Sequence, residues 1–267
     1  MKDYLSINQK AWNIRTEAHW NSQFYDVKGW LSGQTSLKEI ELALLPKDLS
    51  GLRVLHLFCH FGQDTLSLAR MGAEVTGVDL SDQAIKRARE LAGMADLEAR
   101  FINTDVLSLK DKLDEAGSFD LVFQSYGTIG WLPELDEWAK TVAHFLKPGG
   151  QLIFAEFHPV VWMLDDHDRT KLGYPYFNLM PIHEDNEQSY TDGSDNISYS
   201  DVSWNHGLGD VLGVLLKAGL RIDDFQEYDY SPYPCFSDAV AVGDVRWQLK
   251  GIEGQIPMVY SVLGRRG

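Results

Sequence analysis

The sequence predicts an α/β fold: a doubly wound, mostly parallel sheet with helices on both of its faces. Short apolar runs, such as residues 52–58 and 119–124, are typical of strands that are buried on both faces. These runs alternate with helical patterns at a spacing of about 25 residues, which indicates βαβ units. A composition of 44% hydrophobic and 24% charged residues is that of a globular chain of 267 residues.

The predicted elements follow in chain order. Residues 1–50 are rich in aromatic residues and show helical spacing at 37–45, which ends at Pro46, so we expect a helical N-terminal cap. Residues 51–267 are expected to form one domain. Its strands are predicted at 52–58, 74–79, 99–103, 119–124 and 151–157, with helices at 64–71, 83–91 and 135–145 and a turn at 147–150. A helix at 209–218 and strands from 220 and at 257–263 complete it.

Residues 160–203 interrupt this rhythm and are predicted to be an insertion that covers the substrate site as a lid. The segment is acidic and rich in aromatic residues, and a connection of this length is usually functional or disordered. Its acidic run, Asp165, Asp166, His167 and Asp168, is interpreted as a solvated lid surface, with a divalent-ion site as the alternative.

Charge and cysteine content make several classes of function unfavourable. Lysine and arginine number 24 against 39 acidic residues, a net charge of −15, which disfavours nucleic acid or an anionic membrane as the main partner. Two cysteines, Cys59 and Cys235, cannot form a disulfide framework. The N-terminus has no apolar segment of a signal peptide and no window is long enough for a membrane span, so we expect a cytoplasmic protein. The oligomeric state stays open.

Three polar features recur at the ends of the first three predicted strands. The turn after the first strand leads through Gly62 into a helix, whose first backbone N–H groups can bind a ligand. Asp79 ends the second strand, where a carboxylate can accept both hydroxyl groups of a ribose. Asp105 follows the third strand, where it can accept a bond from an exocyclic amine. Ligands of such sheets bind beyond the carboxyl ends of the strands.

Residues 50–160, and more weakly 204–230, resemble the class I S-adenosylmethionine-dependent methyltransferases. The resemblance lies in five motifs in the family's order: the turn at 54–64, Val78-Asp79-Leu80-Ser81, Asn103-Thr104-Asp105-Val106, Phe119-Asp120-Leu121-Val122, and Leu146-Lys147-Pro148-Gly149-Gly150. It implies a Rossmann-like sheet of seven strands, an enzyme that uses S-adenosyl-L-methionine, and methylation of a small-molecule acceptor. It leaves open whether oxygen, nitrogen or carbon is methylated.

The first motif departs from the family pattern. His56 stands at the position of the family's acid, and Phe58 and His60 stand at two of its glycines, so that Cys59 and Gly62 alone agree. We interpret this as an adapted turn that still binds the same cofactor. One alternative is a non-catalytic module that binds a nucleoside. A second is a nicotinamide-dependent oxidoreductase, although Gly62 is the sole remnant of its G-x-G-x-x-G pattern.

The resemblance assigns candidate residues to each part of the site. Those expected to bind the cofactor are His60, Phe61, Gly62, Gln63, Asp79, Leu80, Asp105, Val106 and Gln124. Tyr126, Trp131 and Trp204 are expected to contact the acceptor. His158 and His206 are candidate general bases, with a structural role as the alternative for each. We expect no metal, because His56 and His60 lie on a strand and turn without further ligands.

Overall fold

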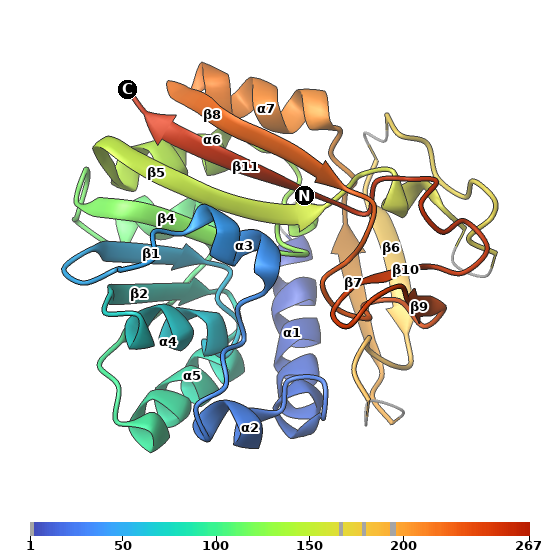
Figure 1. The fold of residues 1–267 in the computed structure, drawn as a ribbon, viewed down its shortest axis with the longest axis horizontal. Coiled ribbons are helices and arrows are strands. Elements are labelled where there is room, and N and C mark those ends of the chain that lie inside the picture. Colours follow the sequence, from blue (N-terminus) through green and yellow to red (C-terminus); the bar gives the residue numbers. More distant parts are fainter. Residues whose placement is uncertain (1–2, 166–167, 178–179, 193–195) are drawn as a thin grey trace.

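The computed structural model describes residues 3–165, 168–177, 180–192 and 196–267 of the chain. Its centre is a seven-stranded sheet in the order β3-β2-β1-β4-β5-β11-β8. The strands are β1 (Arg53–Leu57), β2 (Glu74–Asp79), β3 (Arg100–Asn103), β4 (Phe119–Ser125), β5 (Leu146–Phe157), β8 (Leu220–Tyr228) and β11 (Val259–Arg266). The pairs among β1–β5 are parallel, whereas β11 is antiparallel to both of its neighbours (Figure 1). The predicted fold class is confirmed.

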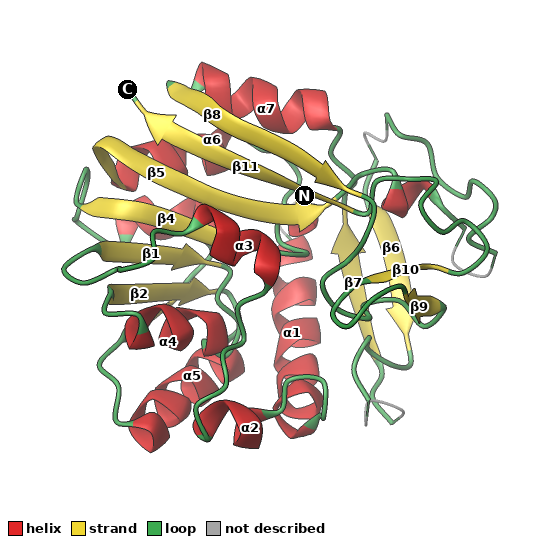
Figure 2. Ribbon diagram, in the orientation of Figure 1, coloured by secondary structure: helices red, strands yellow, loops and turns green. Residues whose placement is uncertain are grey.

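Helices cover both faces of this sheet (Figure 2). One face packs against α6 (Asp136–Phe145) and α7 (Leu208–Lys217), and the other against α3 (Glu39–Leu44), α4 (Gln63–Arg70) and α5 (Asp82–Ala95). Alternate residues of β1 supply the two cores: Leu55 and Leu57 face α6, while Val54 packs on the side of α4. This alternation explains why the strand is apolar throughout.

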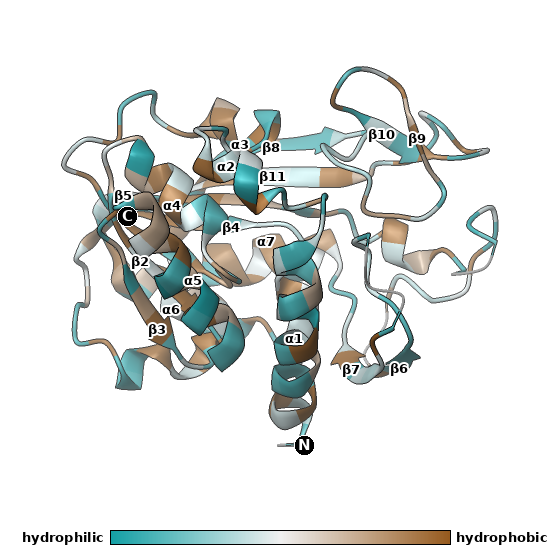
Figure 3. Ribbon diagram, turned by 90° about the horizontal axis from the view of Figure 1, so that it is seen from below, coloured by the Kyte–Doolittle hydropathy of each residue, from teal (hydrophilic) through white to brown (hydrophobic). Residues whose placement is uncertain are grey.

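The N-terminal segment forms α1 (Tyr4–Asn21) and α2 (Val27–Leu31) ahead of α3. Most of the side chains that α1 buries are polar, namely Asn8, Arg15, Thr16 and His19, and the helix shows more teal than brown in Figure 3. An amphipathic helix normally buries an apolar stripe. Much of the buried face of α1 is therefore held by hydrogen bonds, beside ring contacts such as that of Trp12 with Trp131.

Those hydrogen bonds run to the insertion, which forms an antiparallel hairpin of β6 (Ile182–Asn186) and β7 (Tyr199–Ser203). The Asn8 side-chain amide donates to the Val202 carbonyl at 2.8 Å and accepts from the Val202 amide at 2.9 Å. Arg15 forms a buried ion pair with Asp201. As a result α1 lies between the hairpin and the sheet, beside the end toward which β1 and β2 point (Figure 1).

Two local features differ from the prediction. The turn expected at 147–150 lies within β5, because Phe119 pairs with Leu146 and Leu121 with Gln151, so that the intervening residues bulge out of the ladder. A second excursion between β8 and β11 carries the short pair β9 (Ala239–Ala241) and β10 (Trp247–Leu249), which the sequence did not predict. No helix among the described residues is both long and apolar enough to span a membrane.

Candidate functional site

A cavity of about 260 Å³ lies at the carboxyl ends of β1, β2 and β4. Its walls come from α1, from segments 24–41 and 58–64, from the residues after β2, β3 and β4, and from Tyr190 and Tyr233. This is the edge at which an open parallel sheet binds ligands. Of the residues expected to bind a cofactor, all but Gln124 line this cavity.

The turn after β1 has a backbone conformation that glycine favours, although glycine is present at one of its three left-handed positions. Phe58 has φ +58°, His60 φ +49° and Gly62 φ +79°, so three alternate residues adopt the left-handed conformation. For residues with a Cβ this conformation costs roughly 1–2 kcal/mol each. At Gly62 a Cβ would lie 2.8 Å from the Phe101 ring, which excludes any other residue there without movement. Phe58 and His60 therefore adopt the backbone conformation that glycine favours and add two side chains to the cavity wall.

Asp79 fixes this turn to the end of β2. Its Oδ2 accepts a hydrogen bond from the His60 backbone amide at 2.8 Å, and its Oδ1 accepts one from the Ser81 amide at 2.8 Å. Burial raises the pKa of Asp79 to about 6. Each carboxylate oxygen keeps a second lone pair, so the group can still accept two hydroxyl hydrogen bonds from a ligand.

Asp105 lies on the cavity wall after β3. Its carboxylate accepts from the Leu107 amide at 3.1 Å and caps the short 3-10 helix Val106–Asp111, and burial raises its pKa. Leu80 and Val106 line the same cavity. Two apolar side chains next to two carboxylates suit a ligand with a flat apolar ring at one end and hydroxyl groups beside it.

His60 joins the turn to the N-terminal cap and to the insertion. Its Nε2 lies 2.9 Å from Nδ1 of His19, whose Nε2 lies 2.8 Å from the Ser189 hydroxyl. Burial lowers the pKa of His19 and lowers that of His60 to about 3, so both rings are neutral at pH 7. Nδ1 of His60 is buried without a hydrogen-bond partner among the described residues.

His56 does not supply the charge of the acid that the family pattern has at this position. The side chain is buried, and its Nδ1 lies 2.7 Å from the Thr65 hydroxyl. Burial lowers the pKa of His56 to about 4, so the ring is neutral at pH 7. Its Nε2 is buried without a partner among the described residues, although His56 lines the cavity.

Glu41 and Asp64 are cavity residues that the sequence reasoning missed. Glu41 is 1% exposed and accepts hydrogen bonds from the Tyr126 hydroxyl and the Lys38 amide, both at 2.6 Å. Burial, with Asp64 nearby, raises the pKa of Glu41 to about 7. Asp64 accepts from the Ser125 hydroxyl at 3.1 Å. A signal was present, since Glu41 lies on the apolar face of the helix in the 37–45 pattern, where an acid is unusual.

The loop after β4 brings Tyr126 and Trp131 to the cavity, as the sequence predicted. Its shape depends on the buried carboxylate of Glu156, which accepts from the Thr128 amide and hydroxyl at 2.7 Å and from the Ile129 amide at 3.2 Å. Glu156 is a third residue that the sequence reasoning missed. It holds the loop by hydrogen bonds to backbone that would otherwise be unpaired.

Four predicted site residues do not line the cavity. Gln124 is fully buried and bonds to Thr128 and Trp138. Trp204 packs edge-on against Tyr4, which itself lines the cavity.

The two histidines proposed as bases are engaged elsewhere, which corrects that prediction. Nε2 of His158 lies 2.9 Å from Glu227, and its Nδ1 accepts from the Val160 amide at 3.2 Å. His206 donates from Nε2 to the Leu132 carbonyl at 2.8 Å. Both rings hold loops in place, so neither is positioned by this structure to take a proton from a ligand in the cavity.

Over the residues that the structure describes, no group of three His, Cys, Asp or Glu side chains could hold a metal ion. Asp168, from the acidic run of the insertion, forms an ion pair with Lys171 at 2.6 Å. Asp166 and His167 lie outside the described residues.

Comparison with known proteins gives matches to the part of the chain that forms β1–β4 and the start of β5. Residues 54–150 match the family model of a methyltransferase domain. The ubiquinone biosynthesis O-methyltransferase of Sinorhizobium fredii is 35% identical over 112 residues, which are 41% of this chain and 43% of that protein. The Idiomarina loihiensis protein of the same name is 30% identical over 150 residues, or 54% and 60% of the two chains. The chain thus matches about half of the length of these curated relatives.

Solved structures extend the likeness to nearly the whole fold. An S-adenosylmethionine dependent methyltransferase from Mesorhizobium loti aligns with a TM-score of 0.56 and 24% identity, covering 88% of this chain and 100% of that one. One from Clostridium acetobutylicum aligns with a TM-score of 0.57 and 14% identity, covering 97% and 98%. At these identities the alignments establish the fold.

Proposed function

We propose that this chain transfers a methyl group from S-adenosyl-L-methionine to a small-molecule acceptor. The premise is that it has the class I methyltransferase fold and matches a methyltransferase domain at residues 54–150. The observation that carries this proposal is the meeting of the left-handed turn, Asp79 and Asp105 on the wall of one cavity. The curated relatives named as O-methyltransferases support the same reaction class.

The residues present fit this cofactor. When bound, it supplies a methyl group on a positively charged sulfur, and transfer is an in-line displacement. Asp79 would accept the ribose hydroxyls, and Leu80 and Val106 would flank the adenine, whose amine would donate to Asp105. His60, a cavity residue whose Nδ1 has no hydrogen-bond partner among the described residues, would be available to the methionine part.

The cap and insertion would exclude water from the reacting groups. Residues 160–203 are tied to α1 by the Asn8–Val202 and Arg15–Asp201 contacts, and Tyr190 of the insertion lines the cavity. The Tyr190 hydroxyl lies 2.6 Å from that of Tyr25, which belongs to the N-terminal segment. A closed, dry cavity favours displacement at a charged sulfur, because positioning and desolvation do most of the work in this reaction.

Calorimetric titration of the purified protein tests the proposal. We expect S-adenosylmethionine and S-adenosylhomocysteine to bind with micromolar dissociation constants and NADH not to bind. Binding of NADH in place of the sulfur nucleosides would favour the oxidoreductase alternative. Absence of binding by either sulfur nucleoside would mean that the Phe58 and His60 side chains close the site, and the proposed function would be wrong.

A further inference from the structure

One part of the cavity is not accounted for by the cofactor contacts: the wall formed by α3, the start of α4 and the loop after β4. It holds Glu41 and Asp64, which come from the two helices, Ser125 from the end of β4, and Tyr126 from the loop that follows. Hydrogen bonds link them, because the Ser125 hydroxyl donates to Asp64 at 3.1 Å and the neighbouring Tyr126 hydroxyl donates to Glu41 at 2.6 Å. Asp64 also raises the pKa of Glu41, after the larger effect of burial. These groups form one compact cluster, called here the acidic wall.

Among the described residues, no cationic side chain pairs with the carboxylates of the acidic wall. No lysine, arginine or histidine nitrogen of the described residues lies within 4.0 Å of the Glu41 or Asp64 carboxylates to form an ion pair. Lys38, the lysine among the described lining residues, meets Glu41 through its backbone amide. A buried carboxylate without a counter-ion is unfavourable, so a cationic ligand would gain what the protein leaves uncompensated.

Aromatic rings continue this wall across the cavity. Tyr126 and Tyr233 pack with ring centroids 5.3 Å apart, Tyr233 and Phe24 at 5.4 Å, and Phe24 and Tyr25 at 5.1 Å. All four residues line the cavity. Aromatic faces attract cations, and the attraction is stronger where water is excluded. Since the Tyr126 hydroxyl donates to Glu41, its oxygen lone pairs are left to accept a hydrogen bond from a ligand.

An unpartnered buried atom gives an independent sign of a missing ligand. His56 lines the cavity beside Asp64, and its Nε2 has no hydrogen-bond partner among the described residues. Buried polar atoms without partners are rare in native proteins and ask for an explanation. A ligand with N–H groups at the acidic wall would provide one for the tautomer in which Nδ1 carries the proton and donates to the Thr65 hydroxyl.

We propose that the methyl acceptor is a small amine, bound as its ammonium ion between the Asp64 carboxylate, the Tyr126–Glu41 pair and the rings of Tyr25, Phe24 and Tyr233. This inference rests on the proposed function, which it makes more specific. A phenol is the less favoured acceptor, because its oxygen becomes negative as it loses its proton, and Asp64 and Glu41 would repel that charge.

The proton transfer balances within the acidic wall. The ammonium ion gives one proton to a carboxylate, which leaves a neutral amine with a free lone pair and a neutral carboxyl group. The amine nitrogen then forms its bond to the methyl carbon, while the carbon–sulfur bonding pair stays with sulfur. The product is the methylated ammonium ion. Burial, which raises the pKa of Glu41 to about 7, brings this carboxylate closer to the basicity that such a transfer needs.

The test is binding of matched probes to the protein saturated with S-adenosylhomocysteine, measured by calorimetry. Phenethylamine is compared with phenethyl alcohol, its neutral counterpart, and with catechol as a phenolic probe. We expect the amine to bind at least tenfold more tightly than either. Equal or tighter binding of the alcohol or of catechol would overturn the inference, as would failure of the amine to bind at millimolar concentration.

Variants locate the effect in the acidic wall. Asp64→Asn and Tyr126→Phe should each weaken amine binding at least tenfold and leave binding of phenethyl alcohol much less affected. Glu39→Gln, on an acid of the same helix as Glu41 that pairs with Arg246 and does not line the cavity, serves as the matched control and should bind the amine normally.

Titration with S-adenosylhomocysteine alone separates the two ideas. Failure of that titration in the unmodified protein contradicts the proposed function. Success there, without a preference for the amine or without an effect of Asp64→Asn, contradicts the amine inference and leaves the proposed function standing.

Discussion

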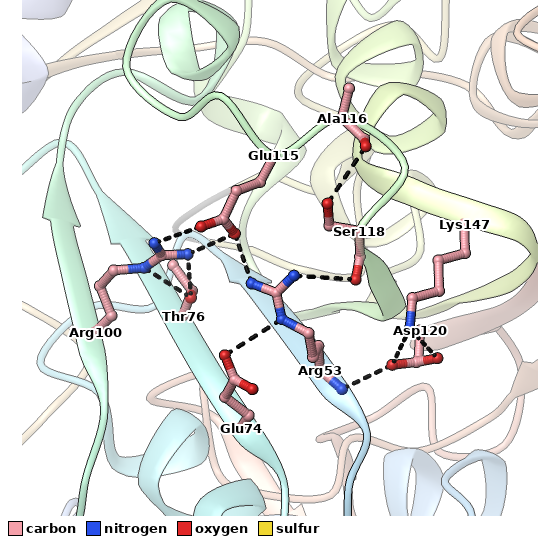
Figure 4. A network of polar contacts seen from close by, with 9 residues as sticks. All are labelled: Arg53, Glu74, Thr76, Arg100, Glu115, Ala116, Ser118, Asp120 and Lys147. Carbon is pink, nitrogen blue, oxygen red and sulfur yellow. Dashed lines mark hydrogen bonds and ion pairs between the residues drawn. The ribbon is translucent and has the colours of Figure 1, made fainter.

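Acidic side chains lie at both ends of the parallel strands, but in the part of the chain that the structure describes they are ion-paired at the amino ends and buried without a cationic partner at the carboxyl ends. At the amino ends, Arg53 bridges Glu74 and Glu115 at 3.3 and 2.7 Å, Arg100 reaches Glu115 at 2.7 Å, and Lys147 meets Asp120 at 2.9 Å (Figure 4). The hydrogen bond from Arg100 lowers the pKa of Glu115 to about 2, because the charged form is stabilised.

At the carboxyl ends the acids are buried without such partners. Burial raises the pKa of Asp79 to about 6 and that of Glu41 to about 7. The amino-end network consists of partly exposed ion pairs that stabilise the fold by small amounts. The carboxyl-end acids weaken the fold when charged, and strongly perturbed acids in a cavity are typical of functional sites. The direction of the pKa shift thus differs between Glu115 and Asp120 at the amino ends, where it is downward, and Asp79 and Glu41 on the cavity wall, where it is upward.

Among the acids of the two ends, Asp79 is expected to have the largest effect on ligand affinity. Asp79→Ala should weaken S-adenosylhomocysteine binding at least tenfold, because hydrogen bonds to a charged acceptor contribute roughly 1.5–3 kcal/mol. Asp114→Asn, on an exposed acid outside the cavity, is the control. Calorimetry measures both, and unchanged affinity in the Asp79 variant would remove Asp79 from the ribose site.

Glu41→Gln should make the protein more stable at pH 8 and should leave stability unchanged at pH 4. The folded-state pKa is raised, so the ionised carboxylate destabilises the fold as pH rises from the ordinary glutamate value through about 7. The gain at pH 8 is expected to be about 1–3 kcal/mol. Chemical denaturation at the two pH values checks this, and a loss of stability at pH 8 would contradict the view that this charge is uncompensated.

Cofactor affinity should fall as pH is lowered from 7 to 5. Asp79 with a pKa of about 6 is mostly ionised at pH 7 and mostly protonated at pH 5, and the protonated group is a poorer acceptor. The ionised fraction falls about tenfold over this interval, which sets the upper limit of the effect. His60, whose pKa burial lowers to about 3, stays neutral throughout. Calorimetry across this range would show a flat profile if Asp79 does not bind the ligand.

Glu115→Gln should have the smallest effect. Loss of its contacts with Arg53 and Arg100 is expected to lower stability by about 1 kcal/mol or less, because these are partly exposed pairs. Affinity for S-adenosylhomocysteine should not change. A large change of affinity would show that the two ends of the sheet are coupled.

The sequence predicted the parts of the site that follow from local pattern. Strand periodicity placed Asp79 and Asp105 at the same edge, since the carboxyl ends of parallel strands meet there. It could not show which way a ring points, so His158 and His206 were expected at the cavity although Glu227 and Leu132 hold them. Tyr233 was missed because it belongs to an excursion whose course depends on distant contacts.

The local sequence pattern could not predict that the polar face of α1 is buried. The buried Asn8 and Arg15 contact Val202 and Asp201, which lie 194 and 186 residues further along the chain. No neighbouring residue reveals such partners, and a polar helix face reads as solvent-exposed in the sequence. Glu41 differs, since an acid on an apolar helix face could have been noticed.

The attachment of α1 to the hairpin also sets an order of assembly during synthesis. Helix α1 leaves the ribosome before the hairpin and buries polar groups whose partners are translated almost two hundred residues later. Since chains emerge at about 5–20 residues per second, α1 must wait for roughly ten seconds or longer with that face in water. The chamber at the sheet edge is completed after the strands that form its floor, so a nascent chain would gain its ligand-binding shape only once the hairpin has been translated.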